Sequence, residues 1–277
     1  METAFTCRFW GVRGTTACPG QPTIRYGGNT ACLELRCGTQ GLILDEGTGI
    51  RALGNLMVRE EKSVHAHILL SHTHIDHIVG LPFFKPAYRA ANRLEIWAGH
   101  LATHQRSLQS VLNGLMEPPY FPVPLDVMHA CIAFHDFRAG ATLDLGSGIS
   151  VKTISLNHPG GSTAFRIEYG GRSLCYVTDT EHPSRGRDSG ILQFVAGSDV
   201  MIYDAAYDDS EYPRFVSWGH SSWQEGARLS RLAGVGQYIP FHHDPEHDDQ
   251  FLDSMDAELQ IVRPGSIVAR EGVSIVI

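Results

Sequence analysis

The chain has 277 residues, 43% of them hydrophobic and 19% charged, and a formal net charge of −8 at pH 7. These values are typical of a globular protein with ample material for a core, and the acidic balance argues against a general nucleic-acid binder, which carries a basic surface. No run approaches about 18 consecutive apolar residues, so we expect no membrane span. The opening residues lack the features of a secretory signal, so we expect a cytoplasmic protein.

The first part of the chain alternates short apolar runs with glycine-containing turns, a pattern typical of β-strands. It predicts strands over 5–11, 31–37, 41–47, 64–70 and 93–99. Apolar residues at helical spacing predict a helix over 49–61. We expect further helices on either side of the strand at 93–99, over 81–90 and 102–116.

The segment 117–130 has four prolines within seven residues, which excludes a helix and predicts an ordered loop or a sheet edge. Strands then dominate, with helices between the later ones. The strands are predicted over 130–137, 149–158, 163–169, 172–179, 199–205, 235–243 and 272–277, and the helices over 188–197, 221–234 and 248–262. This order predicts two packed sheets with helices outside, and no linker divides them, so we expect one domain over 1–277.

Three histidines and an aspartate lie within six residues of the stretch LLSHTHIDHIVG, directly after an apolar strand. In an extended turn His72 and His74 point the same way and reach one ion, whereas Asp76 and His77 point to a second position close by. Imidazole and carboxylate together are ligands for zinc and for manganese or iron. A histidine-rich surface loop is the alternative interpretation, and the apolar strand that leads into the stretch argues against it.

Further polar residues follow other predicted strands, where loops are positioned by a rigid sheet. His158 is the last residue of the strand at 149–158, Asp179 is the last residue of 172–179, and His242 and His243 follow the apolar residues of 235–243. These residues are candidate ligands for the same site.

The motif SHTHIDH matches the H-x-H-x-D-H signature of the metallo-β-lactamase superfamily, and the later candidates come in the order that this superfamily uses. The chain is similar to it over nearly its whole length, from FWGVRG and YGGNT through LDEGTGIRALG to FHHDPEHDD. The resemblance implies an α/β fold, a four-layer αββα sandwich in which two mixed β-sheets pack face to face with helices outside.

The resemblance also implies two divalent metal ions per chain, with zinc as the first expectation and manganese or iron as alternatives. One ion would be held by His72, His74 and His158, the second by Asp76, His77 and His242, with Asp179 bridging both. His243 remains the alternative to His242. The superfamily places an aspartate at Asp45, where it supports the ligand loop, and a turn-capping role is the alternative.

The metal ligands alone do not determine whether the substrate is a lactam, a thioester, a lactone or a phosphodiester. The stretch SWGHSSWQEG is more informative, because His220 immediately precedes a predicted helix and a helix N-terminus attracts anions. The phosphodiesterase branch, which includes ribonuclease Z and cyclic-phosphate phosphodiesterases, resembles this chain in having a histidine followed by Ser and Ser/Thr here. The resemblance implies that His220 donates a proton to the leaving oxygen or stabilises transition-state charge. A structural role beside the helix is the alternative.

The sequence departs from ribonuclease Z between His158 and Asp179, where that family carries a long arm that grips tRNA. Only a strand, a turn and a strand lie here. With the acidic net charge, this favours small substrates such as cyclic nucleotides, cyclic sugar phosphates or short phosphodiesters. Tyr120 and Phe121 are candidates for stacking on a base or sugar, and structural packing is the alternative.

We therefore predict a metal-dependent phosphodiesterase in which a metal-bridging hydroxide attacks phosphorus, His220 is the proton donor, and Asp76 also has a catalytic role. The alternatives are a carbonyl hydrolase such as a lactonase or thioesterase, a tRNA 3′-end endoribonuclease, and a non-catalytic metal-binding protein. The expected partner is a small phosphodiester substrate, without a membrane and without nucleic acid beyond short substrates. A homodimer is left open.

Overall fold

The structure is a computed structural model that describes residues 4–60, 63–184 and 186–277. The last residue of the predicted helix at 49–61 lies outside this described part. Seven strands form one mixed sheet, in the order β13 (Ser274–Val276), β1 (Phe5–Gly11), β2 (Cys32–Cys37), β3 (Gln40–Leu44), β4 (His65–Leu70), β5 (Arg93–Ala98) and β6 (Cys131–Asp136). Six strands form the other, in the order β12 (Gln237–Phe241), β11 (Val200–Asp204), β10 (Arg172–Val177), β9 (Ser162–Tyr169), β8 (Ser150–Leu156) and β7 (Thr142–Asp144).

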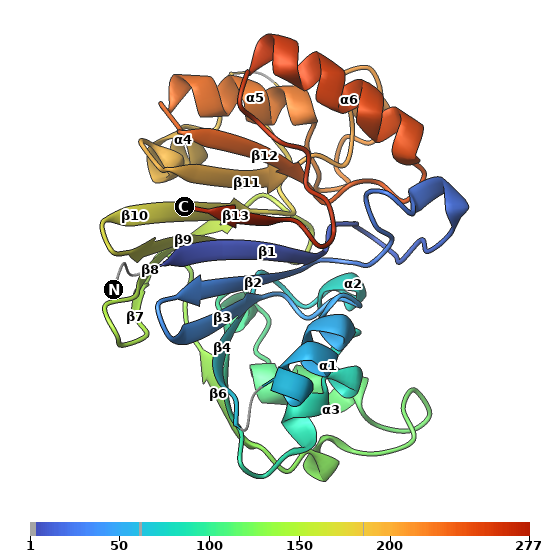
Figure 1. Cartoon of the computed structure of the whole chain (residues 1–277), viewed down its shortest axis with the longest axis vertical. Helices are drawn as coiled ribbons and strands as arrows, with labels where there is room; N and C mark the ends of the chain where they lie inside the picture. The colour runs from blue at the N-terminus through green and yellow to red at the C-terminus, as the bar shows by residue number, and fades with distance from the viewer. Residues whose placement is uncertain (1–3, 61–62, 185) are drawn as a thin grey trace.

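Helices cover the outer faces of both sheets (Figure 1). The first sheet is covered by α1 (Ile50–Glu60), α2 (Ile75–Ile78) and α3 (Leu108–Leu115), and the second by α4 (Ser189–Val195), α5 (Trp223–Leu232) and α6 (Asp249–Val262). Since the two sheets lie face to face between these helix layers, the predicted αββα sandwich is confirmed. Within the described ranges, none of the helices is long and apolar enough to cross a membrane.

Three apolar clusters fill the spaces between the four layers. Leu42 and Leu44 of β3 point to the cluster between the sheets, whereas Ile43 between them points to the cluster under α1 and α3. A third cluster lies between the second sheet and the later helices. Because adjacent residues of a strand face opposite sides, a sheet buried on both faces needs continuous apolar strands, which explains runs such as LILD and VMIY.

Two predicted helices are shorter than expected. Residues 81–90 contain only two 3-10 turns, Leu81–Phe83 and Lys85–Tyr88, because each contains a proline and Phe84 between them is extended. The prediction over 102–116 was wrong at its start, since α3 begins at Leu108 after a cap in which the Ser107 hydroxyl accepts from the Ser110 amide. The short strand β7 was not predicted.

Parallel pairing brings the carboxyl ends of several strands to one edge of the sandwich. In the first sheet, β3 and β4 run parallel, and in the second, β10, β11 and β12 run parallel to one another. Strand β8 shares the direction of β10, because both are antiparallel to β9. Polar residues that follow these strands therefore meet at one place.

Candidate metal centre

The first group of candidate ligands combines both sheets. His72 and His74 follow β4, and His158 follows β8, two residues after that strand ends. His158 Nε2 lies 3.1 Å from His74 Nδ1, and the ring centroids of His72 and His158 are 4.8 Å apart. One nitrogen from each of the three rings lies within 4.8 Å of the others.

The second group lies beside the first and draws on the short helix α2 and the end of β12. His77 Nε2 is 3.2 Å from His242 Nε2 and 3.2 Å from Asp76 Oδ2. His242 Nε2 is 3.4 Å from the same Asp76 oxygen. The Thr15 backbone N–H donates to that oxygen at 2.9 Å, so the N-terminal segment holds the carboxylate in place.

Asp179, two residues after the end of β10, lies between the two groups. Its Oδ1 is 3.7 Å from His72 Nε2, 3.8 Å from His158 Nε2 and 3.3 Å from His242 Nε2. Its Oδ2 is 3.2 Å from His77 Nε2. Burial alone would raise the pKa of this carboxyl, but the histidines around it hold its pKa well below the usual range. Asp179 is therefore an ionised group whose Oδ1 faces imidazoles of both groups and whose Oδ2 faces His77.

Both groups fit divalent metal ions. A tetrahedral zinc site with bonds of about 2.0–2.1 Å places its ligand atoms roughly 3.3 Å apart, close to the separations of 3.1–3.4 Å found here. Burial lowers the pKa of His72 well below its ordinary value, which favours the neutral ligand form. His72 Nε2 is buried and has no hydrogen-bond partner within the described part of the chain. A metal ion would satisfy that nitrogen.

Asp45, at the end of β3, accepts hydrogen bonds that hold the ligand loop, residues 71–77, in place. Its Oδ1 accepts from the Ser71 N–H at 2.7 Å, and its Oδ2 accepts from His77 Nδ1 at 2.9 Å and from the Tyr176 hydroxyl at 2.7 Å. Because His77 donates from Nδ1, its Nε2 lone pair faces the candidate ion. Of the two roles expected for Asp45, the contacts fit support of the ligand loop.

The backbone at three of these positions is unusual. Asp45, Asp179 and His242 each lie within two residues of a strand end and adopt left-handed conformations, with φ of 62°, 57° and 64°. Residues other than glycine rarely adopt this region, and such strain gathers at functional sites. The left-handed turn at His242 also separates it from its neighbour, since His243 Nε2 lies 3.0 Å from the Ala269 carbonyl, away from the cluster.

His220 stands at the edge of the cluster, at the predicted place before α5. Its Nδ1 donates to Asp204 Oδ2 at 2.9 Å and lies 3.9 Å from Asp179 Oδ1. Burial opposes a charge on this ring, but Asp204 and then Asp179 outweigh it and raise the pKa of His220 to about 9. The imidazole is thus held in one orientation with Nε2 free of that bond.

Asp204 was missed in the sequence. This fully buried residue ends β11, and its carboxylate also accepts from the N–H groups of Asp179 and Ser221 at 3.0 Å each. The signal that identified Asp179, an aspartate at the tip of an apolar strand, applies equally to Asp204. It connects the candidate proton donor to the candidate bridging ligand.

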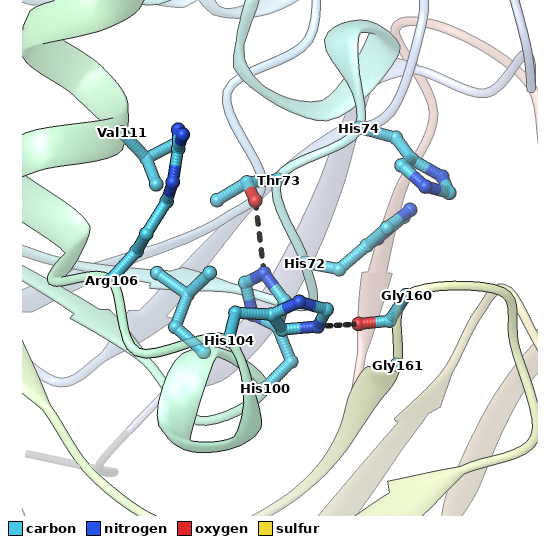
Figure 2. A pocket seen from close by; sticks show the side chains of 10 residues that line it. His72, Thr73, His74, His100, His104, Arg106, Val111, Gly160 and Gly161 are labelled. Carbon is cyan, nitrogen blue, oxygen red and sulfur yellow. Dashed lines mark hydrogen bonds between the residues drawn. The ribbon is translucent and has the colours of Figure 1, made fainter.

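Two hollows border the cluster. A cavity of about 270 Å³, shown in Figure 2, is lined by His72, Thr73, His74, His100, Leu101, His104, Arg106, Val111, Gly160 and Gly161. Here Thr73 Oγ1 lies 2.9 Å from His100 Nε2, and His104 Nε2 lies 2.6 Å from the Gly160 carbonyl (Figure 2). These two histidines belong to none of the His and Asp groups described above. His100 braces the loop that carries His72 and His74, and His104 braces the turn after His158.

The larger hollow is a cleft of about 500 Å³ that opens onto both groups. It is lined by Thr15, His74, Ile75, Asp76, His158, Pro159, Asp179, Tyr207, Phe215, Trp218, His220, Asp244, Pro245 and Glu246. Tyr120 and Phe121 do not line it; Phe121 packs against the cluster under α1 and α3. The cleft therefore offers room for a small substrate beside the candidate ions and His220.

A model of the beta-lactamase superfamily domain matches residues 42–243. The match extends over more than half of the chain and includes every candidate ligand. The protein therefore belongs to the metallo-β-lactamase superfamily, and the family expected from the sequence is confirmed.

Curated relatives are ribonucleases. Ribonuclease BN of Escherichia coli O1:K1 is 25% identical over 185 residues, and that of Citrobacter koseri is 28% identical over 185 residues. Each match covers 67% of this chain and 54% of the relative. The aligned part thus spans about half the length of these relatives.

Solved structures share the fold over nearly the whole chain. The metallo-beta-lactamase fold protein YhfI from Bacillus subtilis has a TM-score of 0.72 at 18% identity, covering 99% of this chain and 100% of that one. A diphosphatase from the PhnP family has a TM-score of 0.71 at 14% identity, with coverage of 98% and 97%. The short form of human tRNase Z has a TM-score of 0.67 at 17% identity, with coverage of 98% of both chains. At these identities the likeness concerns the fold.

Proposed function

We propose that this chain is a dinuclear metal-dependent phosphodiesterase acting on small phosphodiesters. His72, His74 and His158 would hold one divalent ion and Asp76, His77 and His242 the other, with Asp179 between them and zinc as the first expectation. Such ions, when bound, supply an activated water and neutralise charge that develops on the phosphoryl group. Asp76 would orient the second ion, and Thr15 and Asp45 would keep the ligands in position.

The observation that carries the proposal is the pair formed by His220 and Asp204. Departure of an alkoxide from phosphorus is helped by a positioned proton donor, and a histidine followed by two serines is the feature in which this chain resembles the phosphodiesterase branch. His220 lines the cleft, and its 2.9 Å bond to Asp204 fixes the ring with its second nitrogen available to a substrate oxygen. The ribonuclease and diphosphatase names among the relatives support the same chemistry.

Small substrates are favoured because the chain between His158 and Asp179 is compact. Strands β9 and β10 form a hairpin with a turn at Gly170 and Gly171, both with positive φ, and no arm projects from it. The proposal also treats residues 1–277 as one hydrolase domain, since β13 near the end of the chain pairs with β1 near its start.

The test is His220→Ala in the metal-loaded protein, assayed on two phosphodiesters that differ in their leaving group. A cyclic nucleotide expels an alkoxide and should lose about 10²–10⁴-fold in kcat, whereas bis(p-nitrophenyl) phosphate expels a stable phenolate and should lose less. Metal content should stay near two per chain.

His129→Ala is the matched control, because His129 is exposed and belongs to none of the candidate groups. Equal losses on the two substrates would reject the role of His220 as proton donor. Faster turnover of a lactone or thioester than of either phosphodiester by the wild-type protein would overturn the proposed function in favour of a carbonyl hydrolase.

A further inference from the structure

A row of three aromatic side chains forms one wall of the cleft beside the candidate metal centre. Tyr207 and Phe215 stack with ring centroids 4.3 Å apart and planes inclined by 6°, and Trp218 meets Phe215 edge to face at 5.4 Å. Tyr207 also approaches His220, at 6.2 Å between ring centroids. We call Tyr207, Phe215 and Trp218 the aromatic wall. It extends from the candidate proton donor to the outer part of the cleft.

The outermost ring is exposed although its backbone is fixed. Trp218 is 62% exposed, and burying an aromatic ring of this size is strongly favourable, so its position in water leaves a large apolar face without a partner. Gly219, the next residue, accepts from His158 Nδ1 at 2.8 Å and donates to Glu181 Oε2 at 3.0 Å. At φ 88° a Cβ on Gly219 would lie 2.3 Å from Pro159, so only glycine fits. Trp218 is therefore held at a set distance from the candidate ligand His158.

Apart from the candidate ligands and His220, the charged side chains that line the cleft are acidic. Asp244 and Glu246 line it together with the aromatic wall, whereas no lysine or arginine is among its described lining residues. Apart from the candidate ions and His220, the described lining residues thus provide no cationic partner for a second phosphate, and Asp244 and Glu246 repel one. The remaining space suits an uncharged flat group joined to a single phosphoryl group.

We propose that the aromatic wall is a nucleobase subsite, and that the substrate class is a phosphodiester of a single nucleoside, such as a cyclic nucleotide. This inference rests on the proposed phosphodiesterase function. A base would stack on Trp218 while the phosphoryl group lies at the candidate ions beside His220. A cleft of about 500 Å³ accommodates one nucleotide, and the carboxylates disfavour the repeated phosphates of a longer nucleic acid.

The first experiment measures binding without turnover. Adenosine 5′-monophosphate and ribose 5-phosphate, which share the sugar and the phosphate but carry a base and a hydroxyl respectively at the anomeric carbon, are titrated into the metal-loaded protein and followed by calorimetry. The wild type should bind the nucleotide about tenfold more tightly, because stacking of one base contributes roughly 1–3 kcal/mol. Trp218→Ala should abolish this preference and leave affinity for ribose 5-phosphate unchanged, while Trp218→Phe should keep most of it. Tyr120→Ala, which removes an aromatic side chain that is 81% exposed outside the cleft, should change neither affinity.

The second experiment compares turnover of 2′,3′-cyclic adenosine monophosphate with that of glycerol 1,2-cyclic phosphate, which has the same reacting ring and no base. Trp218→Ala should lower kcat/KM about tenfold for the nucleotide and less than twofold for the glycerol ester. Equal affinity of the wild type for the two monophosphates, or equal effects of Trp218→Ala on both, would overturn the nucleobase subsite. A wild type that prefers the nucleotide in binding yet hydrolyses no phosphodiester would retain the subsite and reject the proposed function.

Discussion

The candidate metal centre and the aromatic wall share one cleft but are held in place by different interactions. Candidate ligands are held through their own side chains, as Asp45 holds His77 and the Thr15 N–H holds Asp76. The wall is positioned by stacking and by backbone hydrogen bonds around Gly219. We therefore expect substitutions in the centre to affect metal binding, catalysis and stability together, and substitutions in the wall to affect selectivity alone.

The largest effect is expected at Asp179, the candidate bridging ligand. Asp179→Asn removes the negative charge that both groups of histidines face, so metal content should fall below two per chain. With metal at about a thousandfold excess over its Kd, binding at one site adds roughly 4 kcal/mol to the free energy of unfolding, and this increment should shrink in the variant. The measurement is urea unfolding with and without a chelator, together with metal analysis.

Asp126→Asn, at an exposed loop position, is the control. Two ions per chain and an undiminished increment in Asp179→Asn would contradict the bridging role.

A comparable but more local effect is expected at Asp45, which supports the candidate ligand His77. Asp45→Ala leaves the Ser71 N–H, His77 Nδ1 and the Tyr176 hydroxyl without their acceptor in a fully buried place. Unpaired buried donors cost about 1–3 kcal/mol each, so we expect a loss of a few kcal/mol in the metal-free protein. Metal affinity should also fall roughly 10–100-fold, because His77 loses the group that orients it. Calorimetric titration with zinc measures the second effect, and unchanged zinc affinity would show that Asp45 is only a turn cap.

A smaller effect is expected at Asp204, which acts through His220. Asp204→Asn keeps an acceptor for the backbone N–H groups but removes the charge that favours the protonated ring, so we expect kcat to fall about 10–100-fold with little change in KM. As with His220, the loss should be larger for an alkoxide than for a p-nitrophenolate leaving group. A loss that is independent of the leaving group would mean that Asp204 only maintains the structure.

The centre was predictable from the sequence because metal coordination restricts both residue type and position. Histidine and aspartate are costly to bury at the tips of apolar strands unless an ion or another partner compensates them, and Asp179 and His158 could be placed on this ground. Asp204 meets the same criterion, but neither the H-x-H-x-D-H motif nor the expected order of ligands includes it. The left-handed turn that separates His242 from His243 depends on tertiary contacts and could not be read from adjacent identical residues.

The aromatic wall was not predictable in this way. Phe215 and Trp218 lie in a segment of turns without periodicity, and stacking on Tyr207 depends on the path of the chain between β11 and α5. From the sequence, Tyr120 and Phe121 were instead the candidates for stacking, because these aromatic residues lie beside prolines in a segment expected to form an ordered loop. The broken helix at 81–90 has a similar origin, since apolar spacing favoured a helix that the prolines prevent.

The smallest effect is expected at Glu46, which is adjacent to Asp45 in the chain but differs from it in its hydrogen bonding. Both are fully buried, but Asp45 accepts four hydrogen bonds, whereas neither oxygen of Glu46 has a hydrogen-bond partner within the described part of the chain. Burial, and then the charge of Asp45, raise the pKa of Glu46 to about 8.

Between its ordinary pKa of 4.5 and about 8, the folded chain keeps a proton on Glu46 that the unfolded chain has released, so stability falls as pH rises through this window. Glu46→Gln imitates the protonated acid and should remove this dependence, which is at most about 1.4 kcal/mol per pH unit. We expect the variant to gain stability over the wild type in urea unfolding of the metal-loaded protein as pH increases from 5.5 to 7.5. Glu117→Gln, at an exposed position, should show no such trend. Parallel pH profiles for Glu46→Gln and the wild type would contradict this expectation. They would mean that Glu46 is ionised in the folded chain and that another group stabilises its charge.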